Sequence, residues 1–250
     1  MRGTSVTLRA AAPARPLLAW CAVPAADEHT PSAARRQSGA ARRALTSGLL
    51  RLGLVPHLPS AAHRIALAGP GAVRLVTWDD RQLRPAVQFS LAHTARYGVA
   101  AVRRAGKPYG AGIEPSGLGV DAEDDWAAAE RNLRFFATRA ELAFLQAACG
   151  PLQPLHLWCA KEAIAKAAGH GFRIPPRRYR LHGIDDAQNR LVVTVDGDPS
   201  GPRLAHLRIG TRPTSPPTAW AVAELPLPQC ADFAAMTRDA AADDAESERR

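Results

Sequence analysis

The sequence predicts an α+β fold built from two similar lobes. Hydrophobic residues make up 46% of the chain, which is enough for a packed core. A helical pattern followed by strand patterns occurs twice, once on each side of Gly106–Gly119, which is rich in glycine and proline. This stretch is the best candidate for a linker, since 250 residues allow one large domain or two small ones.

The first lobe is predicted to begin with a strand over Pro16–Val23, after a loose leader at Met1–Ala14. A helix is expected over Pro31–Leu54, because its leucines recur near helical spacing and its arginines occupy the other side. Further strands of this lobe are predicted at Ala72–Trp78, Val87–Ala92 and Gly98–Val102.

The second lobe is predicted to open with a short strand, Leu118–Asp121. A helix follows over Trp126–Phe136, and another starts at Thr138, where Glu141 completes a capping box. An alanine-rich helix, Leu155–Ala168, ends at glycine. The remaining strands, expected in one sheet, are Tyr179–Leu181, Leu191–Val195, Leu204–Thr211 and Trp220–Glu224. The residues after Pro228 read as a mobile tail.

The positive charge is unevenly distributed. The net charge is +9, from 32 basic and 23 acidic residues. Residues 1–118 hold 16 basic and 5 acidic residues, a net +11, whereas residues 119–250 hold 16 and 18, a net −2. This pattern suits a polyanionic ligand together with a metal ion. Nucleic acid is the alternative, but scattered arginines and the lack of zinc-finger, helix-turn-helix or RNP patterns argue against it.

The cysteines indicate a reducing compartment. They are far apart and form no CxxC pair, which favours free thiols, a cytoplasmic location and no zinc site. No apolar run approaches the length that spans a membrane, so no membrane association is expected.

Lysine is scarce, and its placement is informative. The chain has only three lysines, and two of them, Lys161 and Lys166, flank Glu162. On a helix, Glu162 and Lys166 share a face. A surface ion pair worth about 0.3–0.5 kcal/mol is the simplest interpretation. The scarcity of lysine and the apolar neighbours favour a functional site instead, because an ammonium is a compact charge whose pKa shifts readily.

A second polar pattern lies on the strand that opens the second lobe. Asp121 and Glu123 are two apart, so on a strand they point to the same side. Paired carboxylates without nearby His or Cys favour Mg²⁺ over zinc. A solvated acidic turn is the alternative for this segment by itself.

Together the two segments carry a family resemblance. Gly119–Glu123 (GVDAE) followed by Trp158–Lys166 (WCAKEAIAK) resembles the signature of the 4′-phosphopantetheinyl transferases, G-[IV]-D-x-E and [FW]-x-x-K-E-[SA]-x-x-K. Weaker matches are Phe89–Thr94 to F-x-[IL]-S-H-[ST], Arg134–Phe136 with Glu141 to RFF…E, and Gly171–Pro175 to G-x-x-x-P. The resemblance runs from about Arg35 to Glu224 and fits the two-lobed, monomeric subgroup best.

This resemblance implies a fold with pseudo-two-fold symmetry, in which each lobe is a small, mostly antiparallel sheet packed with a helix. The active site is then expected at the lobe interface. On this interpretation, residues 1–14 are expected to be the leader, residues 15–116 the lobe that binds coenzyme A phosphates, residues 117–227 the lobe with the Mg²⁺ and catalytic motifs, and residues 228–250 the tail.

The implied reaction transfers 4′-phosphopantetheine from coenzyme A to a serine of an acidic acyl or peptidyl carrier protein, releasing 3′,5′-ADP. Asp121, Glu123 and Glu162 are implied Mg²⁺ ligands. Glu162 alternatively accepts the serine proton, directly or through a metal-bound water. Lys166 neutralises phosphate charge or protonates the leaving group, and Lys161 contacts phosphate or orients Glu162. Whether the carrier serves fatty acid, polyketide or nonribosomal peptide synthesis stays open.

At the coenzyme A end, the resemblance implies contacts to phosphate from His93, Arg36 and Arg42. The chain lacks the family's G-K-P segment, and Leu83–Pro85 is the nearest match, so Arg84 replaces the lysine. Ala92 stands where serine is usual, which removes a hydrogen bond worth about 1 kcal/mol. A strand-end histidine bonded to backbone and a solvated basic helix face are the alternatives. These departures also keep open a non-catalytic module that binds coenzyme A or carrier domains.

Overall fold

The computed structural model describes residues 16–26, 32–55, 65–68, 75–78, 81–82, 87–104, 116–149, 152–169, 174–185, 190–195 and 203–226. The helices are α1 (Ala33–Arg51), α3 (Trp126–Phe136), α4 (Arg139–Cys149), α5 (Pro154–Ala167) and the short 3-10 helix η2 (Pro176–Arg178). The strands are β1 (Leu17–Ala22), β2 (Ile65–Ala68), β3 (Leu75–Trp78), β4 (Arg81–Gln82), β5 (Val87–His93), β6 (Tyr97–Arg104), β7 (Ser116–Glu123), β8 (Tyr179–Asp185), β9 (Arg190–Val195), β10 (Arg203–Arg212) and β11 (Thr218–Pro226). The predicted α+β class is confirmed.

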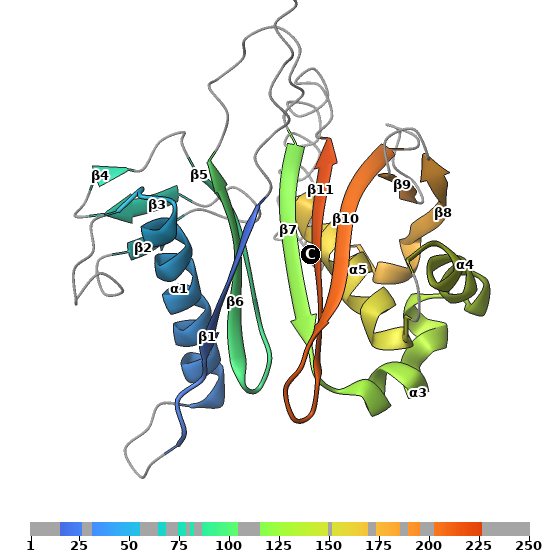
Figure 1. The fold of residues 1–250 in the computed structure, drawn as a ribbon, viewed down its shortest axis with the longest axis horizontal. Coiled ribbons are helices and arrows are strands. Elements are labelled where there is room, and N and C mark those ends of the chain that lie inside the picture. The colour runs from blue at the N-terminus through green and yellow to red at the C-terminus, as the bar shows by residue number, and fades with distance from the viewer. Residues whose placement is uncertain are drawn as a thin grey trace, which may run out of the picture.

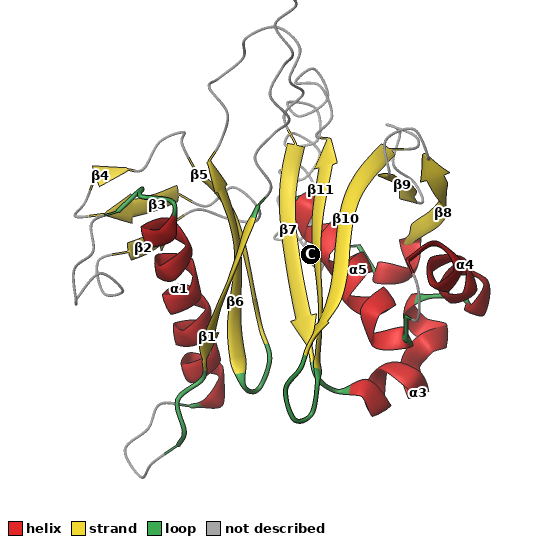
Figure 2. Ribbon diagram, viewed as in Figure 1, coloured by secondary structure: helices red, strands yellow, loops and turns green. Residues whose placement is uncertain are grey.

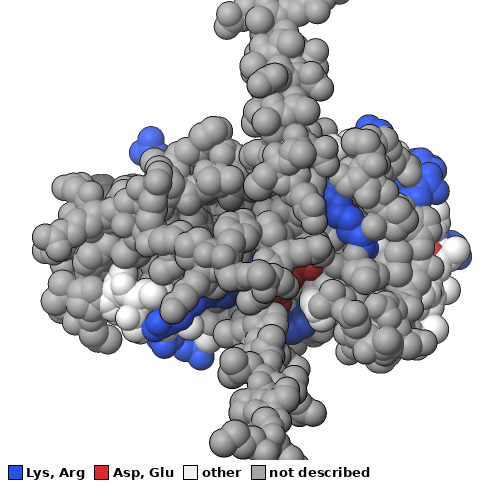
Figure 3. All heavy atoms as spheres, turned by 90° about the horizontal axis from the view of Figure 1, so that it is seen from above, with Lys and Arg blue, Asp and Glu red and all other residues white. Residues whose placement is uncertain are grey.

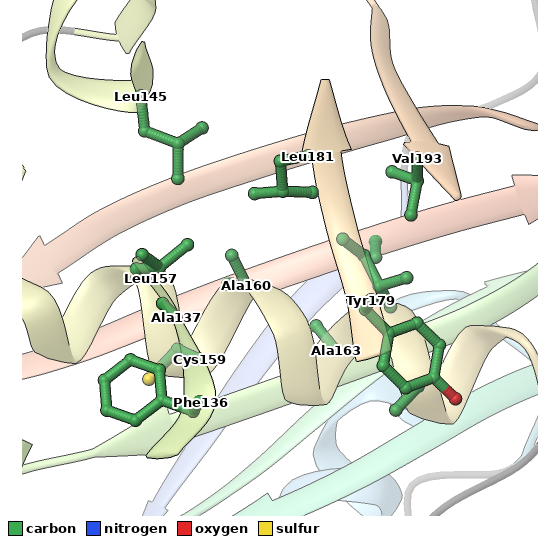
Figure 4. Packing of buried hydrophobic residues seen from close by; sticks show 14 of the residues in the cluster. Phe136, Ala137, Leu145, Leu157, Cys159, Ala160, Ala163, Tyr179, Leu181 and Val193 are labelled. Carbon is green, nitrogen blue, oxygen red and sulfur yellow. The ribbon is translucent and has the colours of Figure 1, made fainter. Parts of the chain in front are cut away.

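The C-terminal half of the fold is a five-stranded sheet covered by α5. Its strand order is β7-β11-β10-β9-β8, and all neighbouring pairs are antiparallel. Helix α5 packs on β7 and β11, with α3 and α4 beside it (Figure 1). Figure 4 shows the core between them, where Leu157 and Ala160 of α5 lie near Leu181 of β8 and Val193 of β9. The expectation that the last four predicted strands share one sheet is therefore confirmed.

The N-terminal half is a three-stranded antiparallel sheet in the order β1-β6-β5, with α1 on its outer side. Alternate side chains of β6 point to opposite faces of the sheet and pack in different apolar clusters. Ala100 and Val102 pack under α1, whereas Val99 and Ala101 face the other sheet. The helix lies unusually close to β6, since a Cβ added at Gly98 would lie 2.0 Å from the Ala41 nitrogen.

The two sheets pack against each other through an apolar layer. It contains Ala92, Val99, Ala101, Leu118, Val120, Ala122 and Val222. The order across the molecule is therefore α1, the three-stranded sheet, the five-stranded sheet and α5 (Figure 2). Ion pairs join the halves: Arg96 Nε lies 3.1 Å from Asp124 Oδ2, and Arg103 bonds Glu224.

Most element predictions match the structure, and the exceptions have local causes. The capping box is confirmed, because Thr138 N donates to Glu141 Oε2 at 3.0 Å and Glu141 N donates to Thr138 Oγ1 at 3.2 Å. The linker prediction over Gly106–Gly119 is wrong for residues 116–119, which belong to β7; residues 105–115 lie outside the described ranges. A third, small sheet, β2-β3-β4, contains two strands that were not predicted.

Two other predicted segments, Met1–Ala14 and the tail after Pro228, also lie outside the described residues. Within the part of the chain that is described, no helix has the length and apolar character needed to cross a membrane.

Candidate active site

The site is built on β7, whose alternating side chains have different tasks. Leu118, Val120 and Ala122 enter the apolar layer between the sheets. The residues between them face α5, and there Gly119 has no room for a side chain: an added Cβ would lie 1.8 Å from the Ala163 carbonyl oxygen. Helix α5 therefore rests directly on the strand. Asp121, the next residue on this side of the strand, contacts Lys166 of the helix.

Helix α5 supplies the matching residues. It starts at Pro154, behind a capping box in which the Gln153 and His156 side chains bond to backbone, and Gly169, with φ of 81°, follows its end. Lys166 lies in the last turn. Its Nζ donates to Asp121 Oδ1 at 2.7 Å and to the Val120 carbonyl oxygen at 3.0 Å.

Glu162 lies one turn before Lys166 and is only 3% exposed. The simple interpretation of Glu162 and Lys166 as a surface ion pair is therefore wrong. Lys166 instead donates a hydrogen bond to Asp121 of β7. After burial, the charges of Asp121 and Lys166 have opposite effects on the pKa of Glu162. Glu162 is thus a buried acid facing an existing ion pair.

The carboxylates shift one another's protonation. Burial, followed by the charge of Asp121, raises the pKa of Glu162 to about 7. Burial, followed by the charges of Asp121 and Asp124, raises the pKa of Glu123 to about 8. The positive charge of Lys166 lowers both pKa values but does not offset these effects. Burial and the neighbouring carboxylates therefore favour the protonated forms of Glu123 and Glu162, and a further cation would favour their ionised forms.

Two carboxylate oxygens of the cluster also lack hydrogen-bond partners. Asp121 Oδ2 and Glu162 Oε2 are buried and have no hydrogen-bond partner. Such atoms cost free energy unless a donor or a cation meets them. An oxygen-only donor set suits a hard cation such as Mg²⁺. Among the described residues, however, no three His, Cys, Asp or Glu side chains are grouped as a ready metal site. The donors fit the ion by their chemistry, while the group bonded to Asp121 is the Lys166 ammonium.

Lys161 points elsewhere. It is fully buried, and its Nζ donates to the Phe136 carbonyl oxygen at 2.9 Å and to Glu141 Oε1 at 2.7 Å. Burial lowers the pKa of Lys161, and Glu141 partly opposes that shift. For Glu141, burial acts to raise the pKa, but the bond and charge of Lys161 outweigh it, so the pKa is lowered. The structure does not bring Lys161 to the carboxylates, because successive helix positions do not share a face.

The predicted coenzyme A contacts have different placements. His93 is exposed at the end of β5, opposite Gly98 of β6. Arg42 is exposed and Arg36 half-buried on α1, while Arg84 lies outside the described residues. Figure 3 shows a face on which a small acidic area lies near basic side chains.

The structure shows where Ala92 lies, the residue that replaces the serine usual in the family. Ala92 is buried in the apolar layer between the sheets. Its side chain packs against the neighbouring sheet, so this placement does not support the expected loss of a hydrogen bond to coenzyme A.

Two residues near the site escaped the sequence patterns. Ser90 of β5 is buried, and its Oγ accepts a hydrogen bond from the Val120 N–H at 3.0 Å. Tyr179 at the start of β8 is fully buried, and burial together with the charge of Glu162 raises its pKa. In the sequence, Ser90 is only a serine on a predicted strand, and Tyr179 is only an aromatic residue at the start of one. Neither pattern is specific enough to indicate a functional residue.

Comparison with protein families agrees with this geometry. Residues 117–223 match the model of the 4′-phosphopantetheinyl transferase superfamily. This part of the chain is similar to that superfamily, and it contains α5, all of β7 except Ser116, and the cluster formed by Asp121, Glu123, Glu162 and Lys166. The match covers fewer than half of the residues of the chain. A search of curated proteins found no match.

Proposed function

We propose that the protein transfers 4′-phosphopantetheine from coenzyme A to a serine of an apo acyl or peptidyl carrier protein, with release of 3′,5′-ADP. The observation that carries the proposal is the convergence of Asp121, Glu162 and Lys166, within the matched domain, around two buried carboxylate oxygens without partners. Attack on a pyrophosphate needs charge neutralisation and positioning more than covalent chemistry, and this cluster offers both.

Asp121, Glu123 and Glu162 are the residues we assign to Mg²⁺. When bound, the ion supplies Lewis acidity to the pyrophosphate and stabilises the leaving oxygen. Burial, followed by the charge of Asp121, raises the pKa values of Glu123 and Glu162, and a bound cation would favour their ionised forms. These three carboxylates thus fit Mg²⁺ because their donor atoms are oxygens and their ionised forms are negatively charged.

Lys166 and Glu162 are the residues we assign to the chemistry. Lys166 holds its protons on Nζ beside Asp121 and neutralises charge on the transferred phosphate or protonates the leaving group. As the alternative to a place in the Mg²⁺ site, Glu162, whose pKa burial raises to about 7, accepts the proton of the attacking serine, directly or through a metal-bound water. Lys161 has a supporting task, since its bond to Glu141 ties α5 to the start of α4.

The two-lobed organisation, with residues 15–116 and 117–227 as similar units, belongs to the same proposal. Each half places one helix directly on a strand at a glycine, α1 at Gly98 of β6 and α5 at Gly119 of β7. This shared arrangement supports a pseudo-two-fold relation with the active site at the interface. The N-terminal half would then bind coenzyme A phosphates through His93, Arg36, Arg42 and Arg84, and its basic charge would attract an acidic carrier protein.

The experiment combines the purified protein, Mg²⁺ and coenzyme A with a panel of apo carrier proteins and measures the intact mass of each carrier. At least one carrier should gain the phosphopantetheine mass. Glu162→Gln should abolish this gain, whereas the matched variant Glu130→Gln, at an exposed position of α3, should not. If no carrier in a broad panel gains mass, the proposal is wrong. Coenzyme A binding by calorimetry without any transfer would identify the non-catalytic binding module instead.

A further inference from the structure

The edges of the two sheets meet beside the acidic cluster. Strand β5 is the last strand of the three-stranded sheet, and β7 is the last strand of the five-stranded sheet. Edge strands present backbone groups that their own sheet does not pair. One such group is the Val120 N–H, which donates to Ser90 Oγ across the boundary at 3.0 Å. Ser90 therefore joins the first sheet to the backbone of β7 by a hydrogen bond, in addition to the apolar contacts between the sheets.

Ser90 is a polar residue in an apolar setting. It lies on the same strand as Ala92, two positions away, and Ala92 packs in the apolar layer with Val120 and Leu118. Ser90 and Val120 are both buried, so water does not readily replace this bond. A buried backbone N–H without a partner is strongly unfavourable, which makes the Ser90 hydroxyl a specific requirement at this point.

The other backbone group of Val120 leads into the cluster. Its carbonyl oxygen accepts a hydrogen bond from Lys166 Nζ at 3.0 Å, and the next residue, Asp121, accepts from the same ammonium at 2.7 Å. A single residue, Val120, thus donates to Ser90 through its N–H and accepts from Lys166 through its carbonyl oxygen. Displacement of β7 at Val120 would move both acceptors of the lysine.

We infer that Ser90 is a positioning residue for the transfer reaction: through Val120 it sets the place of Lys166 and Asp121. The inference rests on the proposed function. It assigns to the N-terminal sheet a part in the chemistry of the other half, in addition to the proposed binding of coenzyme A.

The test compares Ser90→Ala with Ser90→Thr, which keeps the hydroxyl, and with Thr46→Val as a matched control. Thr46 is also buried, and its Oγ1 donates to the Arg42 carbonyl oxygen at 3.0 Å within α1, away from β7. In the full chain, Ser90→Ala should lower kcat roughly ten- to a hundredfold, as expected for a misplaced reacting group, with KM for coenzyme A changed less than about twofold. Ser90→Thr should recover most of kcat, and Thr46→Val should keep the wild-type kcat.

Amide hydrogen exchange at Val120 gives a readout that does not depend on activity. Ser90→Ala should speed this exchange by about tenfold or more relative to the amides of β10, and Thr46→Val should not. Unchanged exchange at Val120, or a kcat for Ser90→Ala equal to that of Thr46→Val, would overturn the inference. If the wild-type protein modifies no carrier, the proposed function fails, and the exchange experiment still decides whether Ser90 holds β7.

Discussion

Replacement of Gly119 by alanine tests the geometry on which the whole site depends. The added Cβ would lie 1.8 Å from the Ala163 carbonyl oxygen, whereas ordinary contact begins near 3.4 Å. The strand and helix must therefore separate by about 1.6 Å, the difference between these two distances. A helix carbonyl cannot rotate away as a side chain does, so the strain falls on the packing of α5.

The expected cost follows from this displacement. Overpacking of a core costs about 1–3 kcal/mol, and a clash with backbone belongs at the upper end of that range. With an m-value of about 2 kcal/mol per molar urea, the midpoint of unfolding should fall by about 1–1.5 M. Lys166 must then span a wider gap to Asp121, now 2.7 Å from its Nζ, so the transfer rate should fall by about a hundredfold.

Urea denaturation followed by circular dichroism measures the first effect, and intact-mass kinetics of a carrier protein the second. Gly39→Ala on α1 is the matched control, because its added Cβ meets only Arg43 Nη1, at 3.5 Å. That change should stabilise the protein by about 0.5–1 kcal/mol, as alanine does in a helix interior. A Gly119→Ala protein with the wild-type midpoint and the wild-type rate would refute the close-packing argument.

The remaining predictions concern charge. Glu141→Gln leaves the buried Lys161 ammonium without its carboxylate and should cost about 3–5 kcal/mol at neutral pH. Because the folded pKa of Glu141 lies below its ordinary value of 4.5, the stabilisation by this pair is complete above that value and is lost as the pH falls through the folded pKa. The difference in Tm between wild type and variant, measured by thermal unfolding, should therefore become smaller in acid. A Tm difference that stays constant from neutral to acidic pH would contradict this. Lys166→Arg keeps the charge but not an easily transferred proton, so the transfer rate should drop by about a hundredfold; an arginine variant of full activity would leave only charge neutralisation to this residue. Removal of Mg²⁺ with a chelator should stop transfer, and added Mg²⁺ should restore it while Zn²⁺ should not, as measured by carrier mass.

Local patterns were sufficient to predict most of the fold. The bounds of α3 agree with the prediction, and the start of α4 follows from the mutual bonds of Thr138 and Glu141, residues only three positions apart. Caps and helical periodicity are short-range properties, so the sequence displays them directly. The start of β7 was misjudged because Gly117 and Gly119 resemble loop residues, whereas in the structure they make room for α5.

The site was predictable in part for a similar reason. The spacing of Asp121 and Glu123 on a strand indicates a shared face, and the structure agrees. Which of two neighbouring lysines turns toward that face depends on how α5 is rotated in its packing, and this the spacing does not reveal. The contact between Ser90 and Val120 joins residues 30 positions apart on two different sheets, so no local pattern could indicate it.

The placement of Lys161 and Lys166 has a physical reason in the acceptors that surround each ammonium group. Lys166 fits between a carboxylate and a carbonyl oxygen of the same strand, and Lys161 fits between a carboxylate and the carbonyl oxygen at the end of α3. Both are positions for a compact point charge with two acceptors close to one atom. Arg103 shows the contrasting case, since its guanidinium bonds Gln88 through Nε and Glu224 through Nη1, partners that lie on different sheets. A planar fork spans two partners, whereas an ammonium concentrates its charge at one point. At Lys166 that point adjoins the carboxylates, where the proposed reaction requires a proton and a positive charge at the same atom.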